Sequence, residues 1–172
     1  MATQYELKNY KSLNTHNGVA WTATLYKGRF KIAYVEDQGN GGSIMVSWNI
    51  SHEKGCADLE KWFLENCEGH WTAQFANLPT SSNEELAINL LDEIRANNKI
   101  AKTKILFRES GVVEIDERGM VVQVPEYTMN KTTIADTNAL GYILNQHPHA
   151  QVWHSSVGKF VNIDLLLMKA SA

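Results

Sequence analysis

The stretch Ala20–Glu36, AWTATLYKGRFKIAYVE, decides how the first third of the chain folds. Apolar and polar side chains alternate over residues 20–26 and again over 29–36. A period of two is typical of a half-buried β-strand, and Gly28 between the two runs indicates a turn. We therefore predict a β-hairpin, to which the run IMVSWNI, residues 44–50, adds a third strand.

After residue 50 the pattern changes to the period of an amphipathic helix, and later it returns to strands. The predicted elements are helices over 57–67, 80–99 and 132–147, strands over 102–108, 111–116, 120–127 and 150–154, and a docked apolar tail over 157–169. The second helix is the clearest, because Ser81 or Ser82 can cap it. Glu84 and Glu85 also suit the positive end of its dipole.

These elements define an α+β protein, in which antiparallel sheet segments carry two to three helices packed on one face. The chain of 172 residues suffices for a single compact domain over 1–172, and the alternative is two lobes, 1–78 and 79–172. Hydrophobic residues make up 44% and charged residues 20%, which is typical of a globular chain.

The composition also limits the function. A formal net charge of -3 argues against a protein that coats nucleic acid through bulk charge. No apolar run approaches the roughly 20 residues that span a bilayer, so we expect no membrane partner. Cys56 and Cys67 cannot build a disulfide framework, and we expect the reduced thiols of a cytosolic protein.

A glycine-rich loop, Glu36–Ser43 or EDQGNGGS, follows the predicted hairpin. The backbone N–H groups of Gly39, Gly41 and Gly42 could cradle a phosphate or another anion. A phosphate-binding P-loop, however, needs a lysine and a following helix, and neither is found here. The alternative is a turn built on Asn40-Gly41, a strong hairpin signal, and the sequence favours this turn.

Aromatic and basic side chains cluster near this loop in the sequence. Nucleic-acid bases stack on exposed aromatic rings, and nearby cations bind phosphates. Alternatively, half of these rings form the sheet core, and we expect Phe30 and either Trp21 or Tyr34 to be buried. The candidate ligand site consists of Gly39, Asn40, Gly41, Gly42, Trp21, Arg29, Tyr34 and Trp48.

The sequence contains no strong catalytic or metal-binding motif. A zinc site needs three or four converging ligands, and the six histidines show no such spacing. There is also no G-x-S-x-G nucleophile elbow. We predict no metal, no cofactor and no catalytic residue. The enzymatic alternative combines Asp37 with His147, His149 or His154, brought together only by the fold.

Five segments together resemble a family of small phage- and prophage-encoded proteins. They are WTATLY (21–26), KIA (31–33), DQGNGG (37–42), LAINLLDEI (86–94) and KTKILFR (102–108). The resemblance extends over residues 5–155. Many members carry Cys after the loop glycines, whereas this chain has Ser43, which argues against a metal or thiol role there. The resemblance implies a bacteriophage context and a location in the host cytoplasm, and it implies no particular activity.

From the glycine loop, the aromatic hairpin and the missing catalytic motifs, we predict a non-catalytic phage accessory protein that counters host defence by binding. It would either sequester a nucleotide-derived immune signal or mask a host defence protein. We expect a homo-oligomer, and favour a homodimer, because two copies can enclose a small ligand. The alternatives are a phage enzyme acting on nucleotides or nucleic acid, and a single-strand nucleic-acid binder, whose affinity would depend steeply on salt.

Overall fold

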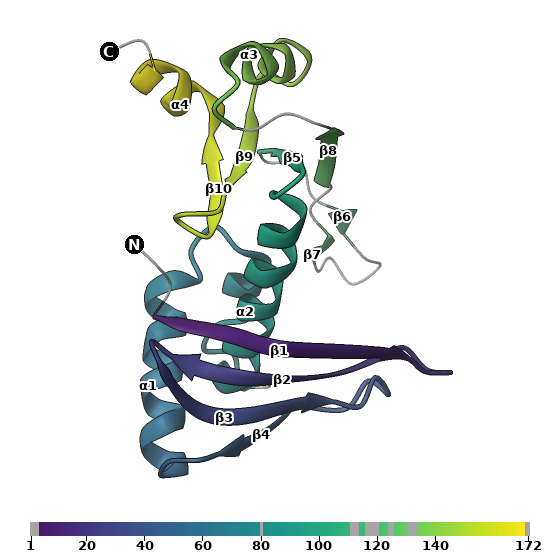
Figure 1. The fold of residues 1–172 in the computed structure, drawn as a ribbon, viewed down its shortest axis with the longest axis vertical. Coiled ribbons are helices and arrows are strands. Elements are labelled where there is room, and N and C mark those ends of the chain that lie inside the picture. The colour runs from purple at the N-terminus through teal and green to yellow at the C-terminus, as the bar shows by residue number, and fades with distance from the viewer. Residues whose placement is uncertain are drawn as a thin grey trace. The chain divides into compact units, whose positions relative to one another are not determined.

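Figure 1 shows the computed structural model of the chain, which describes residues 4–79, 81–110, 114–115, 121–123, 126–130 and 134–170. These residues form two four-stranded antiparallel sheets and four α-helices, which confirms the predicted α+β class. The chain divides into two compact units, Thr3–Arg95 and Ala96–Ala172, which we call the N-terminal and the C-terminal unit. This boundary lies inside a helix, later than the 78/79 position considered from the sequence.

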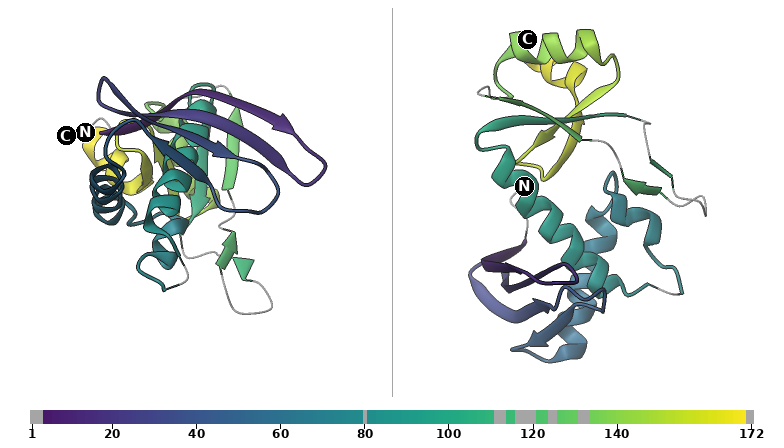
Figure 2. Two further views of the ribbon diagram at one scale, coloured as in Figure 1. Left: turned by 90° about the horizontal axis from the view of Figure 1, so that it is seen from below. Right: turned by 90° about the vertical axis from the view of Figure 1, so that its right-hand side faces the viewer.

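The N-terminal unit is an antiparallel meander with the strand order β1-β2-β3-β4. Its elements are β1 (Tyr5–Asn14), β2 (Val19–Lys27), β3 (Phe30–Asp37), β4 (Met45–Trp48), α1 (His52–Asn66), the 3-10 helix η1 (Trp71–Phe75) and α2 (Asn83–Ile100). The predicted hairpin is β2–β3, and the predicted third strand is β4. Helices α1 and α2 lie on one face of the sheet, the inner face (Figure 2). The opposite, outer face carries exposed side chains such as Tyr34.

The sequence pattern does not predict β1, because a β-bulge interrupts its alternation. Asn9 has a φ of +55°, and the register with β2 shifts between Lys8 and Lys11. A bulge adds one residue to the strand, so the period of two is lost across it. Tyr5 and Leu7, which precede the bulge, are nevertheless buried in the core.

The core of the N-terminal unit lies on the inner face of the sheet, where Leu25, Ala33 and Val35 are fully buried. Trp21 is only 7% exposed, which confirms the prediction that either Trp21 or Tyr34 is buried. The prediction for Phe30 is wrong, since its side chain is 77% exposed. The reason is its position as the first residue of β3, at the hairpin turn.

The C-terminal unit has a second sheet with the order β10-β9-β5-β8 and a separate pair, β6-β7. Its elements are β5 (Lys104–Glu109), β6 (Glu114–Ile115), β7 (Val121–Gln123), β8 (Glu126–Asn130), α3 (Thr137–Gln146), β9 (Ala150–His154), β10 (Lys159–Asn162) and α4 (Ile163–Ala170). The predicted strands over 111–116 and 120–127 lie partly outside the described residues. The apolar tail is docked as β10 and α4, which confirms that prediction.

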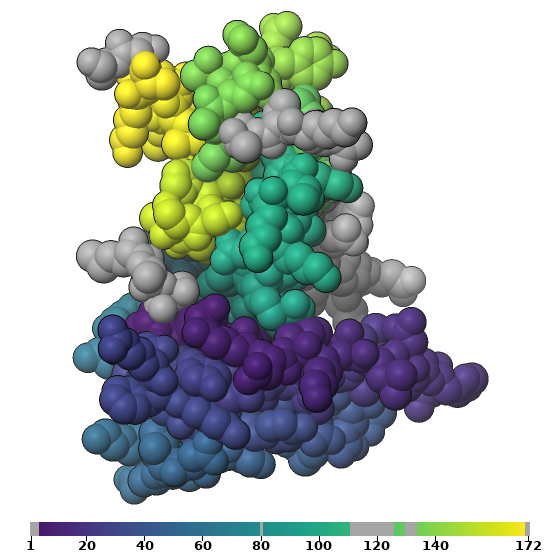
Figure 3. All heavy atoms as spheres, viewed as in Figure 1, coloured from purple at the N-terminus to yellow at the C-terminus, as the bar shows by residue number. Residues whose placement is uncertain are grey.

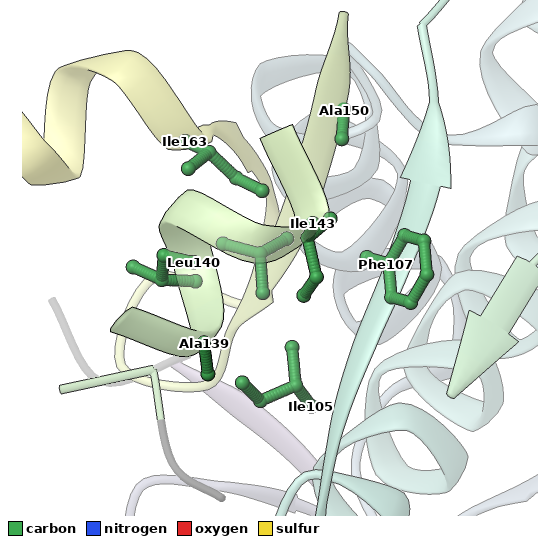
Figure 4. Close-up of a cluster of buried hydrophobic side chains, with 8 residues drawn as sticks. Ile105, Phe107, Ala139, Leu140, Ile143, Ala150 and Ile163 are labelled. Carbon is green, nitrogen blue, oxygen red and sulfur yellow. The ribbon is translucent and has the colours of Figure 1, made fainter. Parts of the chain in front are cut away.

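A single apolar cluster holds α3 and α4 against this sheet (Figure 4). Ile105 and Phe107 of β5 pack against Leu140 and Ile143 of α3, and all four are buried. Helix α3 begins later than the pattern predicts because Asp136 caps it: its Oδ1 accepts the backbone N–H groups of residues 138 and 139, at 3.0 and 3.1 Å.

Candidate functional site

The glycine loop after β3 is shaped by its close approach to β2. Gly39 has a φ of +65°, and a methyl group added there would lie 2.5 Å from the backbone nitrogen of Ala20. It would lie 2.6 Å from the carbonyl carbon of Val19. No other residue type fits this backbone without displacing β2. Gly41, with a φ of +77°, adopts the left-handed conformation with open space around it.

Two of the loop N–H groups are already used inside the loop. The N–H of Gly39 donates to Oδ1 of Asp37 at 2.7 Å, and that of Gly42 donates to Oδ1 of Asn40 at 2.9 Å. Both are turns in which a side chain satisfies the backbone two residues on. A bound anion would have to displace these acceptors, and one of them is itself a carboxylate. The loop is therefore closed by its own hydrogen bonds.

The Trp21 ring belongs to a stack of side chains on the inner face. Its centroid lies 5.2 Å from that of the Tyr10 ring, at an interplanar angle of 19°. The guanidinium of Arg95 in turn lies 3.5 Å from the centroid of the Tyr10 ring. Arg95 in turn pairs with Asp92 at 2.8 Å. Burial, and next the Asp92 carboxylate, raises the pKa of Tyr10. Trp21 thus belongs to a stack that connects the sheet to α2 through Tyr10 and Arg95.

Trp48 also has a structural role. Its indole N–H donates to Glu84 at 2.8 Å, which ties β4 to the first turn of α2. Its ring lies directly over Gly55 of α1, where any side chain would overlap it. This contact explains a glycine near the start of a helix, where glycine otherwise costs up to about 1 kcal/mol relative to alanine.

The other two predicted side chains lie elsewhere on the sheet. Tyr34 is 40% exposed and pairs with Thr24 and Ser47. Its neighbour Ala33 pairs with Trp48, so Tyr34 and Trp48 lie on opposite faces. Arg29 precedes β3, whereas the glycine loop follows it, so the strand's 8 residues separate them. The structure does not gather the eight predicted residues into one site.

The structure instead forms a depression beside the glycine loop, at the ends of three strands. Residues 11–13 of β1, 20–22 of β2 and 36–38 at the end of β3 line a volume of about 270 Å³. This is slightly below the roughly 300–1,000 Å³ of most small-molecule pockets. The carboxylates of Glu36 and Asp37 outnumber the single ammonium group of Lys11. The lining suits an apolar group with a positive charge better than a phosphate.

Two exposed apolar side chains lie at the end of the hairpin next to this depression, and one of them lines it. Leu13, which lines it, is 71% exposed, and Val19 is 50% exposed. Both lie at the end of the β1–β2 hairpin, but Leu13 pairs with Ala20, the neighbour of Val19, so the two side chains lie on opposite faces of the hairpin. This end projects from the sheet at the right of Figure 3, where β1 is coloured dark purple. We call Leu13, Val19 and the depression the hairpin-tip site. The sequence analysis missed it because it depends on recognising β1.

Two of the three histidines of the enzymatic alternative have side-chain partners of their own. The ring of His147 lies 3.3 Å from Glu109 and stacks on Tyr127, and that of His154 lies 2.9 Å from Ser156. They belong to the C-terminal unit and Asp37 to the N-terminal unit. Across the described parts of the chain, no group of three His, Cys, Asp or Glu side chains is placed to hold a metal ion.

Neither cysteine has the surroundings of a nucleophile. Burial, and next the carboxylates of Glu84 and Glu60, raises the pKa of Cys56 to about 12. Burial also raises the pKa of Cys67. A thiol reacts as the thiolate, and burial disfavours the thiolate form of both groups.

Comparison of the chain with protein-family models, curated proteins and solved structures finds no match. The resemblance to phage-encoded proteins therefore stays a prediction. Of the helices that the structure describes, none combines the length and the apolar character needed to cross a bilayer.

Proposed function

We propose that the chain is a non-catalytic binding protein that masks another protein through the hairpin-tip site. The observation that carries this proposal is one exposed apolar side chain, Leu13, which lines the depression at the end of the β1–β2 hairpin. In the phage context that the resemblance implies, the masked protein would be a host defence effector in the host cytoplasm.

The chemistry of the site defines the segment that it would bind. An apolar side chain would enter the depression, and a basic group would face Glu36 and Asp37. β1 is the edge strand of its sheet, so an extended segment could also pair with the backbone of residues 11–14. The expected occupant is an extended protein segment with apolar and basic residues.

The exposed side chain supplies part of the binding free energy. Covering Leu13 would contribute about 1–2 kcal/mol, once its partial exposure is considered. A micromolar complex needs about 8 kcal/mol. The remainder would come from filling the depression and from strand pairing at β1.

Sequestration of a nucleotide receives less support from the same residues. The N–H groups of Gly39 and Gly42 have acceptors within the loop. The depression beside them carries an excess of carboxylates, which repel phosphate.

The proposal is tested by selecting surface-displayed random peptides on the purified full chain and measuring the affinity of the best peptides by calorimetry. We expect peptides that combine apolar and basic residues. Leu13→Asp should weaken their binding at least about tenfold, since it removes the apolar contact and places a hydrated carboxylate where the apolar side chain of the peptide would pack. Phe30→Asp is the matched control, because Phe30 is exposed at the opposite end of β3, and it should change the affinity less than about twofold.

A thermal-shift panel of cyclic and linear nucleotides and short oligonucleotides provides the contrary outcome. A ligand at 100 times its dissociation constant stabilises the native state by about 2.7 kcal/mol. A nucleotide that stabilises wild type and Leu13→Asp equally, with no peptide selected, would contradict masking and support sequestration. Recovery of that nucleotide in altered form would support an enzyme instead.

A further inference from the structure

The two edge strands of the N-terminal sheet differ in how they are guarded against pairing with another chain. β1 has a bulge at Asn9 with Lys8 and Lys11 on either side, and bulges and lysines both discourage such pairing. β4, the lower edge of this sheet in Figure 1, has neither feature. Residues 43–51 contain no charged side chain and no proline, and the register between β3 and β4 is continuous. β4 is therefore the open edge of the sheet.

The hydrogen bonds of this region show which backbone groups face the open edge. The N–H of Asn49 donates to the carbonyl of Ile32 at 2.8 Å, in continuation of the β3–β4 register. Because the backbone groups of a paired strand alternate in direction, those of residues 45 and 47 also point to β3. The groups of residues 44, 46 and 48 point away from β3, toward the open edge.

One of these outward groups is already used. The N–H of Ile44 donates to Oε1 of Glu85 at 3.4 Å. The backbone N–H and C=O groups of Val46 and Trp48 have no hydrogen-bond partner among the residues that the structure describes. The open edge therefore offers the backbone groups of two residues, Val46 and Trp48, to a partner strand.

These groups select one register for a second copy of β4. When Val46 lies opposite Trp48 of an antiparallel second copy, that copy's Val46 lies opposite Trp48 of the first. Both pairs then exchange N–H and C=O groups, which gives about four hydrogen bonds, and Ser47 meets its own counterpart on the twofold axis. A shift by two residues would instead require the N–H of Ile44, which is already used, or residue 50, which lies beyond the end of β4.

The side chains also suit this register. Val46 and Trp48 both point to the inner face, because they pair with the buried residues Val35 and Ala33 of β3. Each Val46 would therefore lie beside a Trp48 of the other copy, and aromatic and β-branched residues are a favourable cross-strand pair. On the outer face Ser47 meets Ser47, so no charge opposes a like charge across the contact.

We propose that β4 is a self-association edge whose occupant is a second copy of this chain, paired antiparallel through the backbone of Val46 and Trp48. Two sheets of four strands thereby join into one continuous sheet. Both edges of the joined sheet are then β1 strands, whose bulge and lysines discourage further growth. The contact is small compared with the roughly 1,600 Å² of a standard interface, so the dimer population depends on concentration. The hairpin-tip site lies at the opposite edge of the sheet, so this dimer is independent of the proposed masking function.

Cysteine cross-linking of the full chain tests the register. Ser47→Cys places two thiols opposite each other on the axis, where the β-carbons lie about 4.5–5.5 Å apart, and mild oxidation should give a covalent dimer. Met45→Cys is the matched control, because Met45 is exposed on the same face of the same strand. Its β-carbon would lie roughly 14 Å from that of its counterpart, so it should cross-link at least about tenfold more slowly. Wild type measures the background from Cys56 and Cys67.

Charge complementation tests the same axis by sedimentation velocity, at concentrations up to about 1 mM. Ser47→Lys and Ser47→Glu each bring two like charges together, and each should raise the dissociation constant of the dimer about fivefold. In an equimolar mixture of the two variants, opposite charges meet at position 47. The mixed dimer should therefore be at least about fivefold tighter than the dimer of either variant alone. Ser155→Lys, at an exposed serine of the C-terminal unit, is the matched control and should leave the dissociation constant unchanged.

Three results would overturn the proposal. The first is a wild-type chain that stays monomeric over the whole concentration range. The second is cross-linking of Ser47→Cys no faster than that of Met45→Cys, which would place residue 47 away from the twofold axis. The third is a mixture of Ser47→Lys and Ser47→Glu that associates no more tightly than either variant alone. A dimer with either of the last two results would form through another surface.

Discussion

The glycine loop and the tip of the β1–β2 hairpin adjoin the same depression. They differ because the loop pairs its N–H groups internally, whereas the tip leaves apolar side chains exposed to water. In the loop, Gly39 and Gly42 donate to side chains of the loop itself, and its tight turn fits against β2. At the tip, Leu13 and Val19 expose apolar surface that no described residue covers. The loop is the more conspicuous in sequence, yet its unusual residues serve the fold. Unsatisfied surface is the better indication of a binding site.

The largest expected effect comes from replacing one buried and one exposed side chain of this region. Trp21→Ala removes a buried ring stacked on Tyr10, and it should reduce the free energy of unfolding by about 3–5 kcal/mol. Leu13→Ala, its exposed counterpart, should change it by less than about 0.5 kcal/mol. Urea denaturation measures both values. Similar losses for the two variants would show that Leu13 also supports the fold, which would remove the contrast.

The second test separates the two reasons for glycine in the loop. Gly39→Ala places a methyl group against the backbone of β2 and keeps a positive φ, so it should destabilise the chain by about 3 kcal/mol. Gly41→Ala meets open space and bears only the cost of its left-handed φ, about 1 kcal/mol. Chemical denaturation of the two variants side by side gives the difference. If Gly39→Ala were as mild as Gly41→Ala, the close approach to β2 would not constrain the loop.

The smallest effect concerns the ion pair between Lys27 of β2 and Asp58 of α1, at 2.8 Å. The hydrogen bond to Asp58 raises the pKa of Lys27, and the same bond lowers that of Asp58. The lowered pKa means that Asp58 stabilises the fold above its unfolded value of about 3.9, and the contribution disappears as the pH falls through the folded value. The raised pKa of Lys27 means that its contribution is present below about pH 10.4 and disappears above it.

Asp58→Asn should therefore lower stability at pH 7, and the difference from wild type should shrink as the pH falls below about 3.9 and through the lowered pKa of Asp58. Thermal unfolding of wild type and variant across this range is the measurement. Glu65→Gln on the outer surface of α1, whose closest ion pair to Lys61 is 4.0 Å long, is the control and should show less pH-dependent difference. A constant difference between wild type and Asp58→Asn at all pH values would exclude the ion pair as its cause.

Hydrophobic periodicity predicts β2, β3 and α2 because each buries one continuous face. It cannot predict β1, where the bulge at Asn9 shifts the register. It also cannot decide which aromatic residues are exposed, since that depends on cross-strand register. The pairing of Ala33 with Trp48, for example, places Trp48 on the inner face and Tyr34 on the outer face. A site that depends on such pairing, like the hairpin-tip site, becomes visible only in three dimensions.

The bulge at Asn9 also bears on aggregation. An uninterrupted edge strand is a template for any other extended chain, and it is a common starting point for fibrils. In β1 the bulge breaks the ladder of unpaired backbone groups in the middle of the strand, and lysines stand on either side of it at Lys8 and Lys11. The bulge leaves two short regular segments, residues 5–8 and 11–14, in place of one long edge, and the second of them adjoins the hairpin tip. The irregularity that hides β1 in the sequence thus divides the edge, so that an added strand at the depression could pair regularly with residues 11–14 alone.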